Sequence, residues 1–546
     1  MNFSNQHREK FIQELSSQQF DLLVIGGGIT GCGIALDAAL RGMKVALVEQ
    51  NDFASGTSSR STKLIHGGLR YLKQYEFKLV FDVGREREIV HRNARHLVIP
   101  EKMLLPITKD GSLNMYEAAV GLFVYDALAG VRPKEWKKML DKQETLKAEP
   151  LLGSNKLEGG GLYYEYKTDD ARLTIEVAKS AHVNGAILLN YASVQNFIYD
   201  AHKKVTGVTV LDKASNNAFE VKAKTIVNAC GPWVDMLRKM DNSLQGKRLL
   251  LTKGVHIVFP SEKLPVKQAV YFDTPDKRMM FVIPHGNVTY AGTTDTVYNE
   301  ALEKPHCTKE DATYLLNAVN NMFPTVHLQL KDIESSWAGL RPLLFEEGKS
   351  PSEVSRKDEI LISASGLISI AGGKLTGYRL MAEKIVNVAV KKSGINYGKS
   401  KTKDFRLSGS EFKNEDEFND YKHHLISKGG HDNIPVTKLT EWFNRYGKNV
   451  TRLIENVNLL RNEHKEDETV FDHAELLYCI ENEMVYSPSD FFTRRTGKLF
   501  FDHAKTEKQI DTLGWFLAER LKIPVNVFQR EVTQVKEEFK EAVGFM

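Results

Sequence analysis

A glycine-rich turn between two apolar segments near the start of the chain constrains the fold more than any other feature. The sequence DLLVIGGGITGCGIALDAALRGMKVALVEQ covers residues 21–50. The apolar run Leu22–Ile25 is typical of a parallel strand that is buried on both faces. Gly26, Gly28 and Gly31 follow it with the G-x-G-x-x-G spacing, before a helical pattern and a second apolar strand. This order predicts a Rossmann-like dinucleotide-binding unit.

The residues of this turn have separate mechanical roles. Gly26 permits the tight turn, Gly28 lets backbone amides approach a pyrophosphate, and Gly31 lets the helix pack closely on the strand. The helix N-terminus adds a positive dipole for the phosphates. Glu49, at the end of the second strand, is expected to accept hydrogen bonds from both ribose hydroxyls of an adenosine. NAD and FAD share this half of the molecule, so the turn alone leaves both open.

Two later segments favour FAD. TIVNACGPWVDML reads as a buried strand that breaks at Gly231 into a helix, and LISIAGGKLTGYRLMAEKIVNVAV reads as a strand, the pair Gly372–Gly373 and another helix. A reduced flavin develops negative charge at N1 and at the C2 oxygen, which a helix N-terminus with Lys374 beside it would stabilise. An ordinary strand-to-helix turn stays open as the alternative for the glycine pair.

Composition narrows the classes of function. A net charge of +4 over 546 residues argues against a nucleic-acid binder. The four cysteines lie far apart without a CxxC pair, which predicts neither a disulfide framework nor a metal site and fits a reducing cytoplasm. The first 20 residues lack the apolar centre of a secretory signal. The longest apolar stretch, residues 116–131, contains Glu117 and Asp126, so we expect any membrane contact to lie on the protein surface.

A set of motifs spread along the chain resembles the FAD-dependent glycerol-3-phosphate dehydrogenases of the aerobic, respiratory kind. The motifs are GGGITG with its distal Glu, GTSSRSTKLIHGGLRYL, VNACGPW, KGVHIVFP, GTTDT, AGLRPL and AGGKLTGYR. They extend from Asp21 to about Arg379, and a looser likeness continues through the C-terminal region. Cys32 and Cys230 stand where family members often have alanine, a change that both small thiols should accommodate.

The resemblance implies an α/β chain, α+β overall, with a Rossmann-like FAD-binding domain, an interleaved β-rich substrate domain and a C-terminal α-helical domain. Within residues 1–395 the FAD-binding domain would take about 20–95, 160–245 and 345–395, and the substrate domain about 96–159 and 246–344. The sequence after Val390 is rich in Lys, Ser and Gly and reads as a linker at 396–413. Charged, glycine-poor stretches predict a helical domain over 414–546.

The resemblance also implies an activity. The chain would oxidise sn-glycerol 3-phosphate to dihydroxyacetone phosphate by hydride transfer to N5 of FAD, and a respiratory quinone would reoxidise the flavin. It would do so as a cytoplasmic protein on the inner face of the cell membrane, with a homodimer as an open possibility. An oxidase that reduces oxygen to hydrogen peroxide would share the pocket and stays the main alternative. An amino-acid oxidase and a catalytically silent scaffold are more distant ones.

The segment HGGLRY supplies expected substrate contacts. Arg70 can offer a planar fork to phosphate oxygens, Gly67 and Gly68 let the backbone approach the isoalloxazine, and Tyr71 can form a wall of the pocket. The remaining member, His66, is a candidate base.

Two further arginines are expected to bind the phosphate. Arg341 lies between Gly339 and Pro342, which predicts a rigid arginine on a loop. Arg356 has charged neighbours that also suit an exposed hairpin, and the resemblance makes it a second phosphate ligand.

The base that removes the hydroxyl proton is expected to be His256. Its strand is apolar, and burial would lower the pKa of His256 and keep the ring neutral. On the residues alone a core histidine is the commoner interpretation, and His66 is the rival base. The catalytic set is therefore His256, Arg341, Lys374 and His66, and Thr293 and Asp295 receive no role. The expected cofactor contacts are Gly26, Gly28, Gly31, Glu49, Thr57, Ser58, Ser61, Gly67, Gly68, Gly231, Gly372, Gly373, Lys374 and Thr376.

Two stretches that mix basic and aromatic residues are candidate lipid contacts. They are RPKEWKKMLDKQ, residues 132–143, and FFTRRTGKLFF, residues 491–501. Each cation near an anionic lipid surface could add about 1 kcal/mol of attraction. A solvated helix face and a packed helix end are the alternatives.

Overall fold

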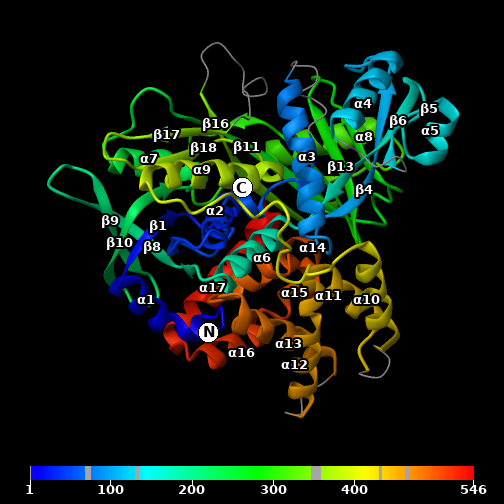
Figure 1. Ribbon diagram of the computed structural model, residues 1–546. Helices are drawn as coiled ribbons and strands as arrows, with labels where there is room; N and C mark the ends of the chain where they lie inside the picture. Colours follow the sequence, from blue (N-terminus) through cyan, green and yellow to red (C-terminus); the bar gives the residue numbers. More distant parts are fainter. Residues whose placement is uncertain are drawn as a thin grey trace.

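The computed structural model of the chain consists of two β-sheets with their covering helices and a group of C-terminal helices (Figure 1). The described residues are 2–67, 76–129, 135–345, 358–428, 433–462 and 467–545. The predicted site residues Gly68, Arg70, Tyr71 and Arg356 lie outside these ranges, and their roles stay predictions.

The first sheet contains the predicted dinucleotide unit. Its main path runs β17–β18–β10–β1–β2–β7, and β9 joins it at β10 with β8 beyond. From β18 to β7 the pairing is parallel, whereas β17, β9 and β8 are antiparallel additions. The strands are β1 (Gln19–Ile25), β2 (Val45–Val48), β7 (Ile187–Leu189), β8 (Ala192–Tyr199), β9 (Val205–Asp212), β10 (Asn217–Asn228), β17 (Glu359–Ile362) and β18 (Ile368–Ala371). The strand–helix–strand prediction is confirmed.

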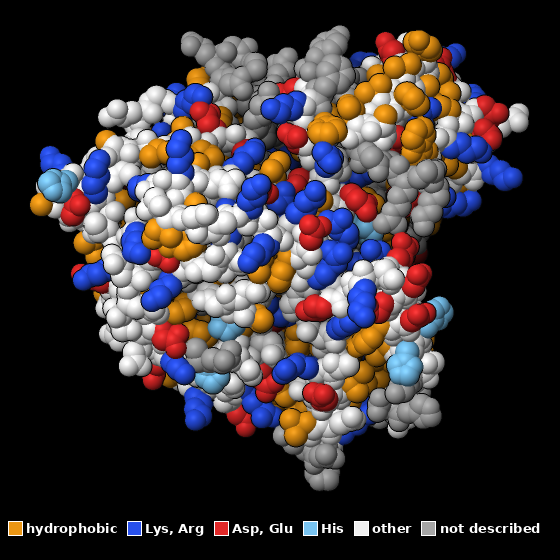
Figure 2. Space-filling model, viewed as in Figure 1, with side chains coloured by type: hydrophobic (Ala, Val, Ile, Leu, Met, Phe, Trp, Pro, Cys, Tyr) orange, Lys and Arg blue, Asp and Glu red, His pale blue; other side chains and the backbone are white. Residues whose placement is uncertain are grey.

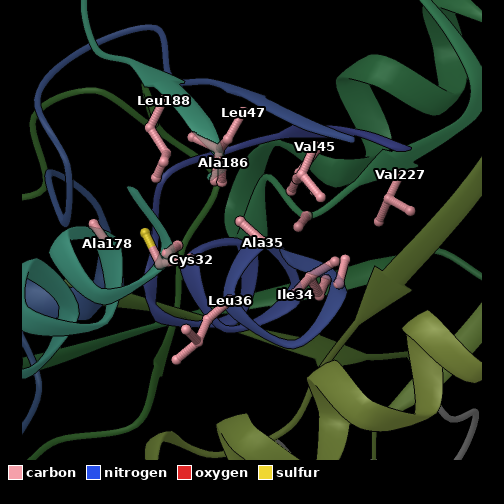
Figure 3. Packing of buried hydrophobic residues seen from close by; sticks show 14 of the residues in the cluster. Cys32, Ile34, Ala35, Leu36, Val45, Leu47, Ala178, Ala186, Leu188 and Val227 are labelled. Atoms are coloured by element: carbon pink, nitrogen blue, oxygen red, sulfur yellow. The ribbon is translucent and has the colours of Figure 1, made fainter. Parts of the chain in front are cut away.

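Helix α2 (Ile29–Leu40) is the central helix of this sheet. It packs against α6 (Asp170–Val183) and α9 (Tyr378–Ser393). Almost all of its residues are buried, because the helix is apolar around its whole circumference. Figure 3 shows Ala35 and Ile34 of this helix lying close beneath the buried valines and leucines of the parallel strands. This packing fixes the helix N-terminus at the carboxyl ends of β1 and β2.

The second sheet is mostly antiparallel. Its order is β15–β11–β14–β13–β12–β4–β6–β3, with β16 paired to β11 and β5 paired to β6. The strands are β3 (Leu64–Ile65), β4 (Ile99–Thr108), β5 (Lys138–Asp141), β6 (Leu157–Lys167), β11 (Leu249–Pro260), β12 (Ala269–Asp273), β13 (Met279–His285), β14 (Val288–Gly292), β15 (Thr296–Val297) and β16 (Ser335–Leu344). Helices α3 (Phe77–Asn93), α4 (Met115–Ala129), α5 (Lys142–Ala148) and α8 (Lys309–Met322) belong to this part of the molecule.

Strand β6 crosses the predicted boundary between the substrate domain and the FAD-binding domain. It pairs with β4 and β5 along its length, so the expected boundary at residue 160 falls inside a strand of the second sheet. Its last residues also pair with β3, where Ile65 lies opposite Tyr166. The segment after the dinucleotide turn therefore enters the second sheet just before His66.

The C-terminal region is helical, as predicted. Its helices are α10 (Glu415–Lys428), α11 (Val436–Tyr446), α12 (Val450–Asn462), α13 (Asp467–Asn482), a π-helix (Asp490–Arg495), α14 (Lys498–Phe501), α15 (His503–Glu507), α16 (Ile510–Leu521) and α17 (Val525–Gly544). The predicted linker contains no helix or strand, but it is held to α3 where Leu407 N donates to Asn93 O. Within the described ranges, no helix combines the length and the apolar character needed to cross a bilayer.

One candidate lipid contact is wrong. The side chains of Phe491, Phe492 and Arg495 are fully buried. Arg494 and Arg495 both form ion pairs with Asp52, at 2.6 Å and 2.5 Å. The stretch FFTRRTGKLFF therefore joins the C-terminal helices to the first sheet and cannot face a membrane, because charge and aromatic rings are both used inside the protein.

Candidate active site

A cavity of about 900 Å³ lies where the two sheets meet. Its walls come from segments spread over more than 300 residues of the chain. Of the predicted site residues, it is lined by Gly26, Gly28, Glu49, Thr57, Ser58, Ser61, His66, Gly231, Arg341, Gly372, Gly373, Lys374 and Thr376. Gly31, Gly67 and His256 lie behind this lining. The structure thus brings together most of the residues that the sequence placed at one site.

The dinucleotide turn is packed as its glycines predict. Gly26 has a φ of +111°, and a Cβ there would lie 2.7 Å from the carbonyl oxygen of Ala229. A Cβ on Gly31 would lie 1.9 Å from the carbonyl oxygen of Gly26, so helix and turn touch directly. Ser58 Oγ accepts a hydrogen bond from Ile29 N at 3.0 Å, in the first turn of α2. The turn and the Thr57–Ser61 segment form one end of the cavity.

Glu49 follows β2 and lines the cavity. Its carboxylate accepts hydrogen bonds from Gly27 N at 2.6 Å and from Asn51 N at 2.8 Å. Burial raises the pKa of Glu49, and these two amides partly oppose that shift. The carboxylate is thereby held at the end of the second strand, where the adenosine ribose of a bound dinucleotide is expected.

The second glycine pair also lines the cavity. Gly372 and Gly373 follow β18 with φ values of +76° and +91°, in the left-handed region that favours glycine. Helix α9 begins five residues later, after Lys374 and the short turn that contains Thr376. Thr376 Oγ1 accepts from His66 N and donates to His66 O, both at 3.1 Å. His66 is thus joined to a residue 310 positions away in the chain.

Arg341 lines the part of the cavity wall that β16 (Ser335–Leu344) contributes. It lies within β16 rather than on the predicted loop, because β16 pairs with β11 through Gly339 and beyond. Its guanidinium donates to Thr294 O at 2.8 Å and forms an ion pair with Asp295 at 3.0 Å, and it also contacts Thr293 Oγ1. Thr293 and Asp295, which received no role from the sequence, therefore orient this arginine.

The glycine opposite Arg341 makes room for the guanidinium. A Cβ on Gly254 of β11 would lie 2.2 Å from both terminal nitrogens of Arg341. The guanidinium consequently lies flat over the backbone of β11. Nothing in the sequence indicated this contact, since Gly254 and Arg341 are 87 positions apart.

The two candidate bases differ in their access to the cavity. His66 lines it, with its ring edge-on to Phe281 at 6.1 Å between centroids. His256 is 1% exposed and stacks on Trp337 at 4.7 Å, and its Nε2 lies 3.0 Å from Oγ1 of Thr62. Burial, with the charges of Arg341 and Lys63, holds the pKa of His256 well below its ordinary value. This shift favours the neutral ring, and the hydrogen bond to Thr62, a residue that lines the cavity, connects His256 to the cavity.

Arg60 is a cavity residue that the sequence reasoning missed. It lies between Ser58 and Ser61, and its carbonyl oxygen would be 2.6 Å from a Cβ on Gly339. Burial lowers the pKa of Arg60. No hydrogen bond or ion pair joins its guanidinium to any described residue. Its place inside GTSSRSTK, beside two predicted cofactor contacts, is the signal that could have identified it.

The residues present fit an FAD molecule, because glycine turns before α2 and α9 and the carboxylate of Glu49 all line one continuous cavity. Residues 21–379 match the FAD dependent oxidoreductases, and residues 400–524 match the C-terminal domain of alpha-glycerophosphate oxidase. The chain is therefore an FAD-dependent oxidoreductase, and its cofactor is FAD.

Individual relatives narrow the family. The aerobic glycerol-3-phosphate dehydrogenase of Bacillus subtilis (strain 168) is 51% identical over 95% of this chain and 94% of its own length. That of Staphylococcus aureus (strain MRSA252) is 47% identical over 99% and 98%. The crystal structure of glycerol-3-phosphate dehydrogenase from Bacillus halodurans, complexed with FAD, superposes with a TM-score of 0.87 at 42% identity, covering 100% of this chain and 99% of that one. The chain belongs to the aerobic glycerol-3-phosphate dehydrogenase family, and the predicted family and fold class are confirmed.

Proposed function

We propose that the protein oxidises sn-glycerol 3-phosphate at its secondary alcohol to dihydroxyacetone phosphate, and that a respiratory quinone is the final acceptor. The observation that carries this proposal is the single cavity in which Arg341, fixed by Asp295, shares a lining with the two glycine turns. When bound, FAD accepts the hydride that leaves C2 of the substrate. The names of the close relatives support the choice of substrate.

Arg341 would bind the phosphate. Guanidinium nitrogens match phosphate oxygens in a bidentate geometry, and the three residues of the GTTDT motif hold the group in place. Arg70 and Arg356 stay predicted partners in this role.

His66 would take the proton of the C2 hydroxyl. It lies on the cavity wall, and both polar groups of its peptide backbone are bound to Thr376. A base must come within hydrogen-bond reach of the proton that it removes. His256 does not line the cavity and, within the described part of the chain, is bonded to it through the Thr62 hydroxyl, so we assign the base to His66.

Lys374 is proposed to balance negative charge that develops near the flavin. It lines the cavity directly after the glycine pair and before α9. A cation and a helix N-terminus at the same place would both stabilise an anion.

A membrane-surface location is part of the proposal. Helix α4 is buried on one side, whereas Tyr116, Val120 and Phe123 form a stripe on its other side with exposed fractions of 77%, 45% and 51%. Trp136 is 44% exposed and lies edge-on to Phe123 at 6.0 Å. Figure 2 shows hydrophobic side chains gathered over α4, at the upper right. Aromatic side chains of this kind favour the interface of a bilayer.

This stripe suits a lipid surface better than a second copy of the chain. Its four large side chains offer roughly 400 Å² of apolar surface, about half of what each partner contributes to a standard interface. The four cysteines are free thiols, as suits the cytoplasmic side. The homodimer stays a prediction, without a surface assigned to it.

The experiment mixes the purified holoenzyme anaerobically with glycerol 3-phosphate, glycerol or lactate and follows the flavin absorbance. Only glycerol 3-phosphate should bleach the flavin. Bleaching by lactate alone would contradict glycerol 3-phosphate as the substrate. A purified chain without flavin absorbance would indicate a catalytically silent scaffold. Peroxide formed per turnover, compared with reduction of a quinone analogue, tests the acceptor: one peroxide per substrate would establish the oxidase alternative.

The base is tested with two variants. His66→Asn should slow flavin reduction roughly 10²- to 10⁴-fold, whereas His256→Asn should slow it far less. The opposite order would return the role to His256.

A further inference from the structure

A buried polar cluster lies directly behind His66, and the proposed mechanism does not use it. Tyr125 of α4, Glu165 of β6 and Arg87 of α3 are 0%, 2% and 2% exposed. They come from three different elements of the second sheet region. None of them lines the cavity.

The cluster binds the peptide that follows His66. Gly67 N donates to Tyr125 Oη at 2.9 Å, and it lies 3.4 Å from Glu165 Oε2. A Cβ on Gly67 would lie 2.4 Å from Tyr125 Oη and 2.7 Å from Cε2, so the tyrosine ring is packed against this glycine. The position must be glycine because the ring occupies the space of a side chain.

Glu165 is the acceptor for the other two side chains of the cluster. Tyr125 Oη donates to Glu165 Oε1 at 2.5 Å and accepts from Gly67 N. Arg87 Nη1 donates to Glu165 Oε2 at 3.0 Å and to Tyr164 O at 2.9 Å. Burial and the charge of Glu165 raise the pKa of Tyr125 well above its ordinary value, so the phenol keeps its proton and stays a donor.

His66 is consequently held from both sides. Its own N–H and C=O are bound to Thr376, on the wall formed by the second glycine pair. The next N–H is bound to Tyr125, and the preceding residue, Ile65, is paired to Tyr166, the penultimate residue of β6. The peptide on each side of the histidine therefore has a fixed partner.

Filling this space with polar and charged side chains is energetically less favourable than filling it with apolar ones. Burying an ion pair costs desolvation that well-packed apolar residues would avoid, so such a pair is weak evidence for stability alone. The acceptors of the Gly67 N–H are the side chains of Tyr125 and Glu165, and apolar side chains in their place would leave this buried donor without them. The unfavourable burial of the cluster, together with its bond to the Gly67 N–H, indicates that the cluster positions the backbone next to His66.

We infer that Tyr125 and Glu165 are positioning residues, which hold the Gly67 peptide and thereby aim His66 at the C2 hydroxyl of the substrate. The inference rests on the proposed function of His66. Small displacements of a catalytic group are costly, and about 1 Å can reduce a rate by roughly 100-fold.

The test is Tyr125→Phe, with Tyr163→Phe as the matched control. Tyr163 is an equally buried tyrosine beside Tyr125, at 6.2 Å between ring centroids, and it has no bond to Gly67. Each variant loses one hydroxyl from the same region. Anaerobic flavin reduction by saturating glycerol 3-phosphate, the substrate concentration at half-maximal rate, the flavin spectrum and thermal unfolding are measured for the holoenzymes.

Tyr125→Phe should reduce the maximal rate of flavin reduction roughly 10- to 100-fold, with the half-saturating concentration within about twofold of wild type and FAD retained. Tyr163→Phe should stay within about twofold of wild type. Wild-type reduction rates in Tyr125→Phe, or equal losses in both variants, would overturn the inference. A wild-type enzyme that is not reduced at all would instead reject the proposed function.

Glu165→Gln provides a second test if Tyr125→Phe folds poorly. It preserves volume but replaces one acceptor oxygen by a donor, which leaves either Tyr125 or Arg87 facing an N–H. The same loss of rate without loss of substrate affinity is expected. A rate that falls only in proportion to lost FAD would mean that the cluster is structural and would refute the assignment.

Discussion

Gly254→Ala is expected to disable Arg341 without removing it. The added Cβ would lie 2.2 Å from both terminal guanidinium nitrogens and 2.4 Å from Cζ. Contact between such atoms requires about 3.5 Å, so the guanidinium must move by about 1 Å or more. It would then lose the geometry set by Thr294 and Asp295.

The magnitude follows from that displacement. A misplacement of about 1 Å can cost roughly 100-fold in rate, which corresponds to about 2.7 kcal/mol in kcat/KM. Arg341→Ala, which removes the group entirely, should cost about 2 to 5 kcal/mol. The alanine variant at Gly254 should therefore retain more activity than the variant that lacks the arginine.

Protein stability should change little. Gly254 is not at a positive φ, and the atoms in the way belong to the end of a flexible side chain that is 18% exposed. Alanine in place of glycine also reduces the freedom of the unfolded chain, which stabilises by about 0.4 to 1 kcal/mol. Gly254→Ala should therefore lower the activity without lowering the stability of the protein.

The assay is kcat/KM for glycerol 3-phosphate together with thermal unfolding and FAD content. Gly121→Ala is the control, because a Cβ there would meet nothing within 4 Å. Wild-type kcat/KM in Gly254→Ala would refute the reasoning, since it would show that the position of the Arg341 guanidinium is irrelevant to the substrate. A variant that loses FAD would show that the change acts through the fold.

Three further predictions concern the cofactor, the response to acid and the membrane. Glu49→Gln should weaken FAD binding roughly 10- to 100-fold, because charge-assisted bonds contribute about 1.5 to 3 kcal/mol; titration of apoprotein with FAD measures it, and an unchanged Kd would contradict a ribose contact. Burial lowers the pKa of His96 to about 3 and of His285 to about 4, whereas both titrate near 6.5 when unfolded. The unfolded chain then binds more protons as pH falls below about 6.5, so each histidine removes up to about 1.4 kcal/mol of stability per pH unit. Urea unfolding between pH 7 and 5 should show this loss, and His96→Phe should make the slope shallower; an unchanged slope would exclude His96. Phe123→Ser should reduce co-sedimentation with lipid vesicles while flavin reduction by glycerol 3-phosphate in solution stays at the wild-type level; equal sedimentation of both proteins would exclude the α4 stripe.

Local sequence patterns were sufficient for the parts of the site that depend on backbone conformation. The spacing of Gly26, Gly28 and Gly31 predicted a turn that the structure reproduces. Gly26 has a positive φ, and a Cβ on Gly26 or Gly31 would collide with backbone atoms. The same holds for Gly372 and Gly373, whose positive φ values follow directly from a strand that ends in a glycine pair. The backbone conformation at these positions is a local property, although the atoms that a Cβ on Gly26 would meet belong to Ala229, far away in the chain.

The sequence by itself therefore determined the dinucleotide turn, the buried parallel strands, the helical C-terminal region and the family. Tertiary structure alone decided that Arg341 lies in a strand over Gly254, that FFTRRTGKLFF is buried against Asp52, and that His66 rather than His256 reaches the cavity. These outcomes depend on contacts between residues far apart in the chain. These contacts are stabilised by burial and by charge pairing. A pattern of neighbouring residues in the sequence does not show which distant residues will be buried or paired together.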